Sequence, residues 1–189
     1  DILDWIQPDW VFDTESGAFQ WGWARQRPRI DLEIYPCRQA DWRLFASHHY
    51  LDLPPMVASA HYMGLVRGQP VAHIAFSTRP GMAEARACRL VVMPEWQGAG
   101  VGMRFLNGCC QLWLDGDNRY ARPLRTLFHT SHPGLAAALK WTQVSAQLHG
   151  GSKARSSASL RKTMGADAGS GFGGHLRAVQ GFRYLGEDV

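Results

Sequence analysis

The chain has 189 residues, of which 46% are hydrophobic, and its formal net charge at pH 7 is +4. This length suits one domain with an extension, and the apolar content suffices for a sizeable core. No apolar run approaches the roughly 20 residues of a membrane-spanning helix, which argues against a membrane protein. The mildly positive charge permits an acidic cofactor or a nucleic acid as partner and requires neither.

The start of the chain and its cysteines bear on location. The sequence begins Asp1-Ile2-Leu3-Asp4, without Met and without a basic or apolar leader, so we expect a processed, trimmed or internal start and no secretory signal. None of the cysteines belongs to a Cys-x-x-Cys pair; they are Cys37, Cys88, Cys109 and Cys110. The pattern predicts reduced, buried thiols and a cytoplasmic protein.

Residues 1–28 have no clear hydrophobic period and are predicted to be an N-terminal extension or linker. Within them, residues 13–17 are typical of a turn between two short extended pieces, residues 10–12 and 18–23. Residues 29–189 are predicted to be the main domain.

The main domain opens with alternating apolar residues that predict a strand over 30–35 and then a short helix over 40–47. Residues 62–66 and 70–77 flank a short Arg-Gly-Gln turn and are predicted to form a hairpin. Residues 85–93 are predicted to be the third strand of this meander.

The second half of the domain alternates helices and strands. A helix is predicted to run to about Leu114, followed by a strand at 126–129, a short helix at 135–141 and a closing strand at 175–185. Residues 149–174 are rich in Gly, Ser and Ala and carry several Lys and Arg, which predicts a mobile basic loop.

The most informative stretch is a glycine-rich turn between a strand and a helix. Its strand holds the apolar residues Leu90, Val91 and Val92, and Pro94 ends it because proline has no N–H for a ladder. The turn reads Gln97-Gly98-Ala99-Gly100-Val101-Gly102. A helix that starts after such a turn presents backbone N–H groups and the positive end of its dipole, which together favour an anion.

Two common anion-binding turns do not fit. A nucleoside-triphosphate loop needs Lys and then Ser or Thr after its last glycine, and neither follows Gly102. A dinucleotide-binding turn needs Gly-x-Gly-x-x-Gly, and its last glycine position is Met103. An ordinary glycine-rich turn without a ligand is the remaining structural alternative.

The turn resembles the Gln/Arg-x-x-Gly-x-Gly/Ala signature of the GCN5-related N-acetyltransferases, with Gln97, Gly100 and Gly102 at its fixed positions. The resemblance implies that the backbone from Gln97 to Met103 holds the pyrophosphate of acetyl-CoA, or of another acyl-CoA. It also implies the family's fold, a mixed α/β (α+β) domain with a central, mostly antiparallel mixed sheet flanked by helices. The predicted order of elements agrees with that fold.

The resemblance also implies how the rest of the cofactor is held. The strand with Leu90, Val91 and Val92 would diverge from its neighbour and offer free backbone groups to the pantetheine arm. A backbone N–H near Val92 would polarise the thioester oxygen. Ser131 would form a hydrogen bond with the cofactor.

Transfer to an amine also needs a base for the amine proton and a donor for the leaving thiolate. Histidine has an unperturbed pKa near 6.5, which suits the base, and we favour His49 and His132 for acid–base work. Tyr50 is a candidate donor to the thiolate, a role that tyrosine has in relatives. Glu84, just before the cofactor strand, is a candidate base acting through water.

Other histidines receive structural interpretations. His73 and His129 fall within predicted strands and are interpreted as structural. A metal site built from His48, His49 and His61 would lack any supporting Cys or carboxylate spacing, so no metal is predicted.

A second resemblance concerns a subgroup of these acetyltransferases that is often joined to an ABC-type ATPase. It rests on residues 48–51, residues 130–133 and the closing Phe182-x-Tyr184, and residues 4–11 resemble the tail of such an ATPase. The His-His-Tyr patch is also similar to phage Mom-type proteins, which modify adenine in DNA. This resemblance implies an upstream ATPase domain and a DNA or RNA base as amine acceptor, which the basic loop and positive charge favour.

Two further interpretations stay open. The acceptor could instead be a small amine or a protein, and the acyl group is not specified by the sequence. Alternatively the domain could be a non-catalytic regulatory or nucleic-acid-binding module that binds CoA weakly or not at all. The intact turn at 97–102 favours the enzyme, since a degenerate domain would be free to lose it.

Overall fold

The computed structural model describes residues 8–21, 29–52, 56, 58–78, 84–147 and 179–186. The expected basic loop at 149–174 lies outside the described residues. The chain divides into two compact units, Asp1–Asp31 and Leu32–Val189, whereas the sequence suggested a boundary after residue 28.

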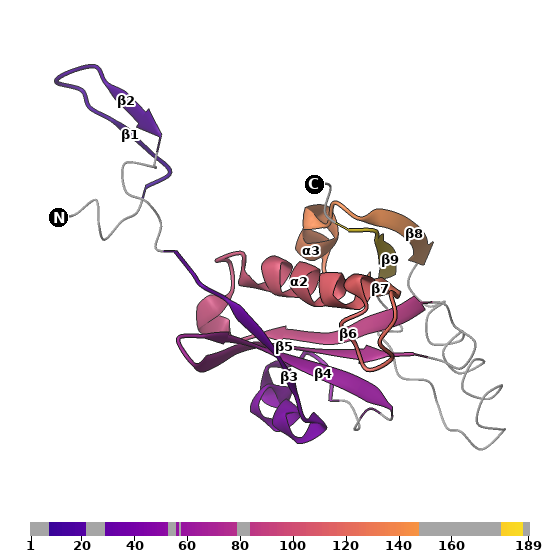
Figure 1. The fold of residues 1–189 in the computed structure, drawn as a ribbon. Coiled ribbons are helices and arrows are strands. Elements are labelled where there is room, and N and C mark those ends of the chain that lie inside the picture. The colour runs from indigo at the N-terminus through magenta and orange to yellow at the C-terminus, as the bar shows by residue number, and fades with distance from the viewer. Residues whose placement is uncertain are drawn as a thin grey trace. The chain divides into compact units, whose positions relative to one another are not determined.

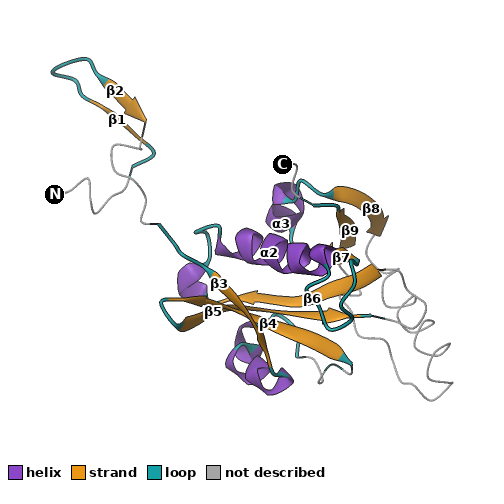
Figure 2. Cartoon of the chain, in the orientation of Figure 1, coloured by secondary structure: helices purple, strands orange, loops and turns teal. Residues whose placement is uncertain are grey.

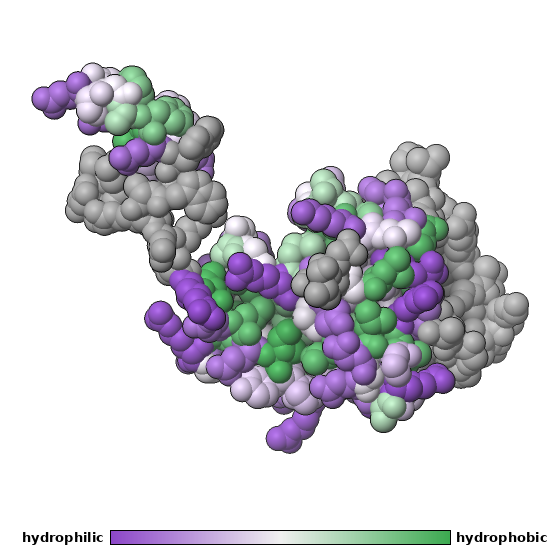
Figure 3. Space-filling view, turned by 45° about the horizontal axis from the view of Figure 1, so that its top comes forward, coloured by the Kyte–Doolittle hydropathy of each residue, from purple (hydrophilic) through white to green (hydrophobic). Residues whose placement is uncertain are grey.

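The described part of the first unit is a β-hairpin. Strands β1 (Trp10–Phe12) and β2 (Phe19–Trp21) pair antiparallel, with Trp10 and Phe19 stacked at 5.7 Å between ring centroids. The Asp13 carboxylate closes the turn, because it accepts hydrogen bonds from the Glu15 N–H at 2.9 Å and the Ser16 hydroxyl at 2.6 Å. These hydrogen bonds lower the pKa of Asp13, and the bond from the Ser16 hydroxyl has the largest effect. The expected turn between two extended pieces is confirmed, and apolar side chains gather on this hairpin (Figure 3).

The second unit is built on a seven-stranded sheet in the order β3-β4-β5-β6-β7-β9-β8 (Figure 1). All neighbouring strands pair antiparallel except β6 and β7, which are parallel. The expected mixed, mostly antiparallel sheet is therefore confirmed. The strands are β3 (Glu33–Cys37), β4 (Ser59–Val66), β5 (Gln69–Ser77), β6 (Glu84–Val92), β7 (Arg125–Thr130), β8 (Thr142–Gln147) and β9 (Val179–Tyr184).

Helical segments lie on both faces of the sheet (Figure 2). One face carries the long helix α2 (Val101–Asp115). The others are short: 3₁₀ helices η1 (Gln39–Leu44), η2 (Ala46–His48) and η3 (Pro94–Trp96), and helix α3 (Pro133–Ala138).

Three elements differ from their sequence-based prediction. The helix expected over 40–47 is two short 3₁₀ helices, η1 and η2. Helix α3 starts and ends earlier than the predicted 135–141, because Pro133 occupies its first position and its fixed φ suits a helix start. Strand β8 was not predicted. Its sequence, Thr-Gln-Val-Ser-Ala-Gln, has little of the apolar alternation that marks a strand, and it forms the edge of the sheet beside β9.

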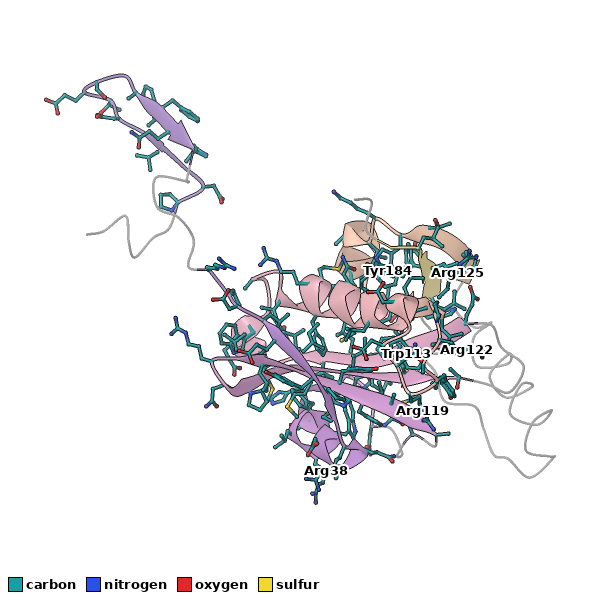
Figure 4. The ribbon with its side chains drawn as sticks, viewed as in Figure 1. Arg38, Trp113, Arg119, Arg122, Arg125 and Tyr184 are labelled. Carbon is teal, nitrogen blue, oxygen red and sulfur yellow. The ribbon has the colours of Figure 1, made fainter. Side chains whose placement is uncertain are left out.

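The core lies between α2 and the sheet. Phe105, Cys109 and Trp113 recur every four residues along α2, so they lie on one helix face, and each is fully buried. Trp113 stacks on Phe76 of β5 at 5.0 Å, and the Tyr184 hydroxyl of β9 donates to Gln111 of the helix (Figure 4). The helix is thereby fixed against β5 and β9, which flank the two strands that form the cleft described next.

Candidate active site

Strands β6 and β7 pair along only part of their length. Their parallel ladder runs from Glu84↔Arg125 to Ala87↔Phe128, and residues 88–92 have no partner on β7. On its other edge β6 is bulged, because two residues, Arg89 and Leu90, face a single residue of β5 between the pairs Ala75↔Cys88 and His73↔Val91. Arg89 adopts a positive φ of 55° there. Bulges are common beside active sites, where they redirect backbone groups and side chains.

A cleft of about 1220 Å³ lies where the two strands part. Its wall is formed by β6 and the glycine turn, by the segment from Phe128 to Leu135, and by residues 48–51. It brings together most of the residues singled out from the sequence: His49, Tyr50, Leu90, Val91, Val92, Gln97, Gly98, Gly100, Gly102, Met103, Ser131 and His132. The predicted residues Glu84, Ala99 and Val101 do not line the cleft.

The glycine turn is shaped to leave backbone groups exposed. Gly98 and Gly100 have φ values of 79° and 78°, which glycine adopts without strain. The Gln97 amide donates to the Val92 carbonyl at 2.9 Å and so ties the turn to the end of β6. A Cβ on Gly102 would lie 3.1 Å from a methyl of Val92, so this glycine allows the helix to begin close against the strand.

The start of α2 fits an anionic group such as a pyrophosphate. The first helical hydrogen bond runs from the Arg104 N–H to Gly100 O, so the N–H groups of Val101, Gly102 and Met103 have no acceptor within the helix. The first turn of α2 contains no acidic residue. Although the Val101 side chain is buried in the core, its backbone N–H belongs to this set.

His49 keeps one ring nitrogen available. Its Nδ1 lies 2.9 Å from the Leu51 carbonyl and 3.2 Å from the Leu51 N–H, and its ring packs against Trp42 and Tyr50. When Nδ1 carries the proton and donates to the carbonyl, Nε2 is left with a lone pair and can act as a base.

His132 is held in the opposite state. Its Nδ1 accepts the Leu135 N–H at 3.0 Å as the N-cap of α3, and the backbone N–H of His132 donates to the Thr130 hydroxyl. An imidazole that accepts at Nδ1 carries its proton on Nε2 when neutral. His132 therefore suits the donor role, and its lone pair is already engaged.

The structure adds His129, which the sequence analysis had interpreted as structural. It lines the cleft immediately beyond the last β6–β7 pair. Its Nδ1 is buried and has no hydrogen-bond partner among the described residues. Burial of the imidazole is the main cause that lowers its pKa to about 4, and the positive charge of Arg86 adds to the effect. The sequence signal that could have found His129 is the alternation of side chains along the strand. Thr126, Phe128 and Thr130 are buried on one face of the sheet, so His129, which falls between them, lies on the opposite face.

Glu84 has a different partner. Its carboxylate accepts a two-pronged hydrogen bond from Arg183 of β9, at 2.5 Å and 3.3 Å, and both side chains are partly buried. The pair joins strands distant in sequence, at the end of β6 away from the glycine turn. The structure thus does not bring Glu84 to the cleft.

The half-buried Ser59 and the buried His61 and His73 form a chain of polar groups on β4 and β5. The Ser59 hydroxyl bonds to His61 Nε2 at 2.7 Å, and His61 Nδ1 lies 3.1 Å from His73 Nε2. Burial, followed by His61, lowers the pKa of His73 to about 4. His73 is fully buried between Trp42 and Phe45, which agrees with its structural interpretation.

Two further properties apply to the described residues alone. Within that part of the chain, no three His, Cys, Asp or Glu side chains are grouped to hold a metal ion. No helix found there is long and apolar enough to cross a membrane.

Comparison with known proteins identifies the fold. No family model matches the chain, and no curated protein matches it in sequence. Among solved structures, the ribosomal-protein-S18-alanine N-acetyltransferase of Escherichia coli matches with a TM-score of 0.52 at 12% identity, covering 84% of this chain and 99% of that one. Arabidopsis thaliana NAA60, solved in complex with a bisubstrate analogue, matches with a TM-score of 0.54 at 11% identity, covering 82% of this chain and 97% of that one.

A third structure, a GNAT family acetyltransferase from Elizabethkingia anophelis with acetyl-CoA bound, matches with a TM-score of 0.50 at 9% identity, over 80% and 96% of the two chains. These structures share the sheet and helix arrangement described above. The chain therefore has the GNAT acetyltransferase fold that its glycine turn predicted.

Proposed function

We propose that this protein is an acyl-CoA-dependent N-acyltransferase that moves an acetyl group directly to a primary amine. One observation carries the proposal: the split between β6 and β7 and the N–H-rich start of α2 open into the same cleft. The neighbours of this fold support it, since they are acetyltransferases and one of them holds acetyl-CoA.

The roles of the cofactor-binding residues follow from their positions. Bound acetyl-CoA supplies an acetyl group activated as a thioester. The backbone from Gln97 to Met103 would bind its pyrophosphate, and the unpaired backbone of Leu90–Val92 would line the pantetheine arm. A backbone N–H of this strand would polarise the thioester carbonyl.

Different side chains are assigned to take the proton from the amine and to give one to the thiolate. The amine nitrogen bonds to the carbonyl carbon, the carbon–sulfur bond breaks, and the amine releases one proton to a base. His49 and His129 are the candidates for that base, because both side chains line the cleft. His49 Nε2 keeps its lone pair when Nδ1 donates to the Leu51 carbonyl. His132 Nε2–H and the Tyr50 hydroxyl are the candidate donors to the departing thiolate.

The test is CoA binding to Gly100→Asp, with Gly68→Asp as its matched control. Both glycines have nearly the same φ, 78° and 74°, and a Cβ on either meets no atom within 4 Å. The two substitutions therefore impose similar backbone strain, but only Asp at residue 100 places a negative charge beside the pyrophosphate. Calorimetry should show CoA binding at least 100-fold weaker in Gly100→Asp and unchanged within about twofold in Gly68→Asp.

Two other outcomes would contradict the proposal. Normal CoA binding by Gly100→Asp would show that the turn is not the pyrophosphate site. Failure of the unaltered protein to bind CoA or acetyl-CoA would favour the alternative, a non-catalytic module with this fold.

The finer identity of the acceptor and of any upstream domain remains predicted from the sequence. The His-His-Tyr patch, residues 48–50, lines the cleft. Two other features behind a DNA or RNA acceptor and an upstream ATPase, the basic segment 149–174 and the first half of residues 4–11, lie outside the described residues. Salt-dependent binding to DNA or RNA would support that acceptor, and its absence would remove it.

A further inference from the structure

The part of the cleft wall beyond the cofactor site is rich in rings. The cofactor is assigned to β6 and the glycine turn, which leaves residues 48–51 and 128–135 as the main remaining segments of the wall. Each of these two segments contributes ring side chains to the lining: His48, His49, Tyr50, His129 and His132. An acceptor in this part of the cleft therefore lies against imidazole and phenol rings.

The rings of His49 and Tyr50 form a fixed platform. The His49 ring contacts both Trp42 and Tyr50, with 5.5 Å and 4.7 Å between ring centroids. The backbone of Leu51 holds the imidazole at Nδ1, so the ring does not rotate freely. Because Tyr50, at the end of this row of rings, is 62% exposed, a planar group in the cleft can stack on it.

Carboxylates are missing from the described part of the wall. Among the described residues that line the cleft, none is Asp or Glu. An alkyl amine is an ammonium ion at pH 7, since the pKa of such a group is about 10.4 in lysine, and burying that charge is costly without an anionic partner. Arg86 and Arg89 line the cleft too, but each already has an interaction partner, and their charge has the same sign as an ammonium ion. The described wall therefore suits an amine that is uncharged at pH 7.

We propose that the acceptor is an aromatic amine, with its amino group attached directly to a planar ring, as in an arylamine or a nucleobase. This inference rests on the proposed function and names its substrate class. The nitrogen lone pair of such an amine is delocalised into the ring, so the amine is neutral at pH 7 and needs no carboxylate. Its nitrogen bonds to the thioester carbonyl carbon, the carbon–sulfur bond breaks, and the base described above takes the proton while the ring lies against Tyr50.

The test uses bisubstrate probes, because these measure acceptor recognition without turnover. CoA is joined through an acetyl linker to aniline, to cyclohexylamine or to spermidine. The first two probes end in uncharged amides and differ in whether the six-membered ring is planar. Calorimetry on the full chain should show the aniline probe binding 10-fold or more tightly than the cyclohexylamine probe, as expected for one stacking contact, with the spermidine probe weakest.

A fourth probe distinguishes two sources of the same chemistry. It joins CoA through the same linker to the exocyclic amino group of adenosine. Tighter binding than that of the aniline probe assigns a nucleobase as the acceptor. Weaker binding, with the preference for aniline over cyclohexylamine retained, assigns a simple arylamine.

Tyr50→Leu and Tyr35→Leu form a matched pair of variants. Tyr35 is 49% exposed on β3 and does not line the cleft. Tyr50→Leu should reduce the preference for the aniline probe to within about threefold and leave the affinity for CoA within about twofold. Tyr50→Phe keeps the ring and should keep the preference, and Tyr35→Leu should keep it as well.

The outcomes are distinct. Equal binding of the aniline and cyclohexylamine probes, tightest binding of the spermidine probe, or equal loss of preference in Tyr50→Leu and Tyr35→Leu would overturn the aromatic acceptor while CoA binding remains intact. If CoA itself does not bind, the proposed function fails and the inference falls with it.

Discussion

At the scale of single residues, the roles of the cleft histidines depend on what their second ring nitrogen contacts. His132 uses Nδ1 as a helix cap and presents Nε2–H. His129 keeps a buried Nδ1 without a partner among the described residues. Its pKa, lowered to about 4, keeps His129 neutral at pH 7 but also makes it a weaker base than an ordinary histidine.

We expect His129→Gln to lower kcat by about 10²-fold, the lower end of the range for general base catalysis. Steady-state kinetics with the preferred acceptor measure this, and the contribution of His129 should persist down to about pH 4, where it becomes protonated. Glu84→Gln is the control. Loss of its pair with Arg183 should cost about 1 kcal/mol of stability, with kcat unchanged within about twofold. If His49→Gln abolishes turnover and His129→Gln does not, His49 is the base.

At the scale of secondary-structure elements, the cleft depends on how closely α2 approaches β6. Gly102 at the first turn of the helix faces Val92 at the end of the strand, and the Gln97 amide bonds the Val92 carbonyl. The bulge at Arg89 and the end of the β6–β7 ladder then direct the strand's free backbone groups into the cleft. The anion site and the acyl site are therefore two ends of one strand.

Gly102→Ala should lower the free energy of unfolding by about 1–3 kcal/mol, because its Cβ would sit 3.1 Å from Val92 and push the helix away. CoA affinity should fall as well, since the N–H groups of the first turn shift. Urea unfolding and calorimetry measure the two effects. In Gly102→Ala/Val92→Ala the contact is relieved, so the double variant should be less destabilised than the sum of the single changes. Strict additivity would show that the contact does not position the helix.

At the scale of the whole molecule, stability should depend on pH through buried histidines. His73 is fully buried and its pKa is lowered from 6.5 to about 4. Below pH 6.5 His73 takes up a proton in the unfolded chain but stays neutral in the folded protein, and this difference favours unfolding. The contribution of neutral His73 to folded-state stability is therefore complete above pH 6.5 and is lost as the pH falls to about 4. The full loss is roughly 3 kcal/mol for this residue.

Urea unfolding at pH 7.5, 6.0, 5.0 and 4.5 checks this expectation. The unaltered protein should lose stability steadily over the series, and His73→Gln should be less stable at pH 7.5 with a shallower dependence on pH. His48→Gln, at an exposed residue, should follow the unaltered protein. An unchanged slope in His73→Gln would show that His73 does not carry this dependence.

The sequence by itself determined the local features of this protein. Gln97, Gly100 and Gly102 between an apolar strand and an apolar helix predicted the turn and the fold, and the hairpin that opens the meander of β4, β5 and β6 was expected from its short Arg-Gly-Gln turn. These features are readable because backbone dihedrals and hydrophobic period act over a few neighbouring residues. The edge strand β8 was not predicted from the sequence, because its residues have little apolar alternation.

Only the tertiary structure decided which polar residues share the cleft. Glu84, a candidate base from the sequence, pairs with Arg183, which lies 99 residues further along the chain, whereas His129 lines the cleft just beyond the last β6–β7 pair. Contacts between distant segments depend on strand order and register, which no local pattern specifies.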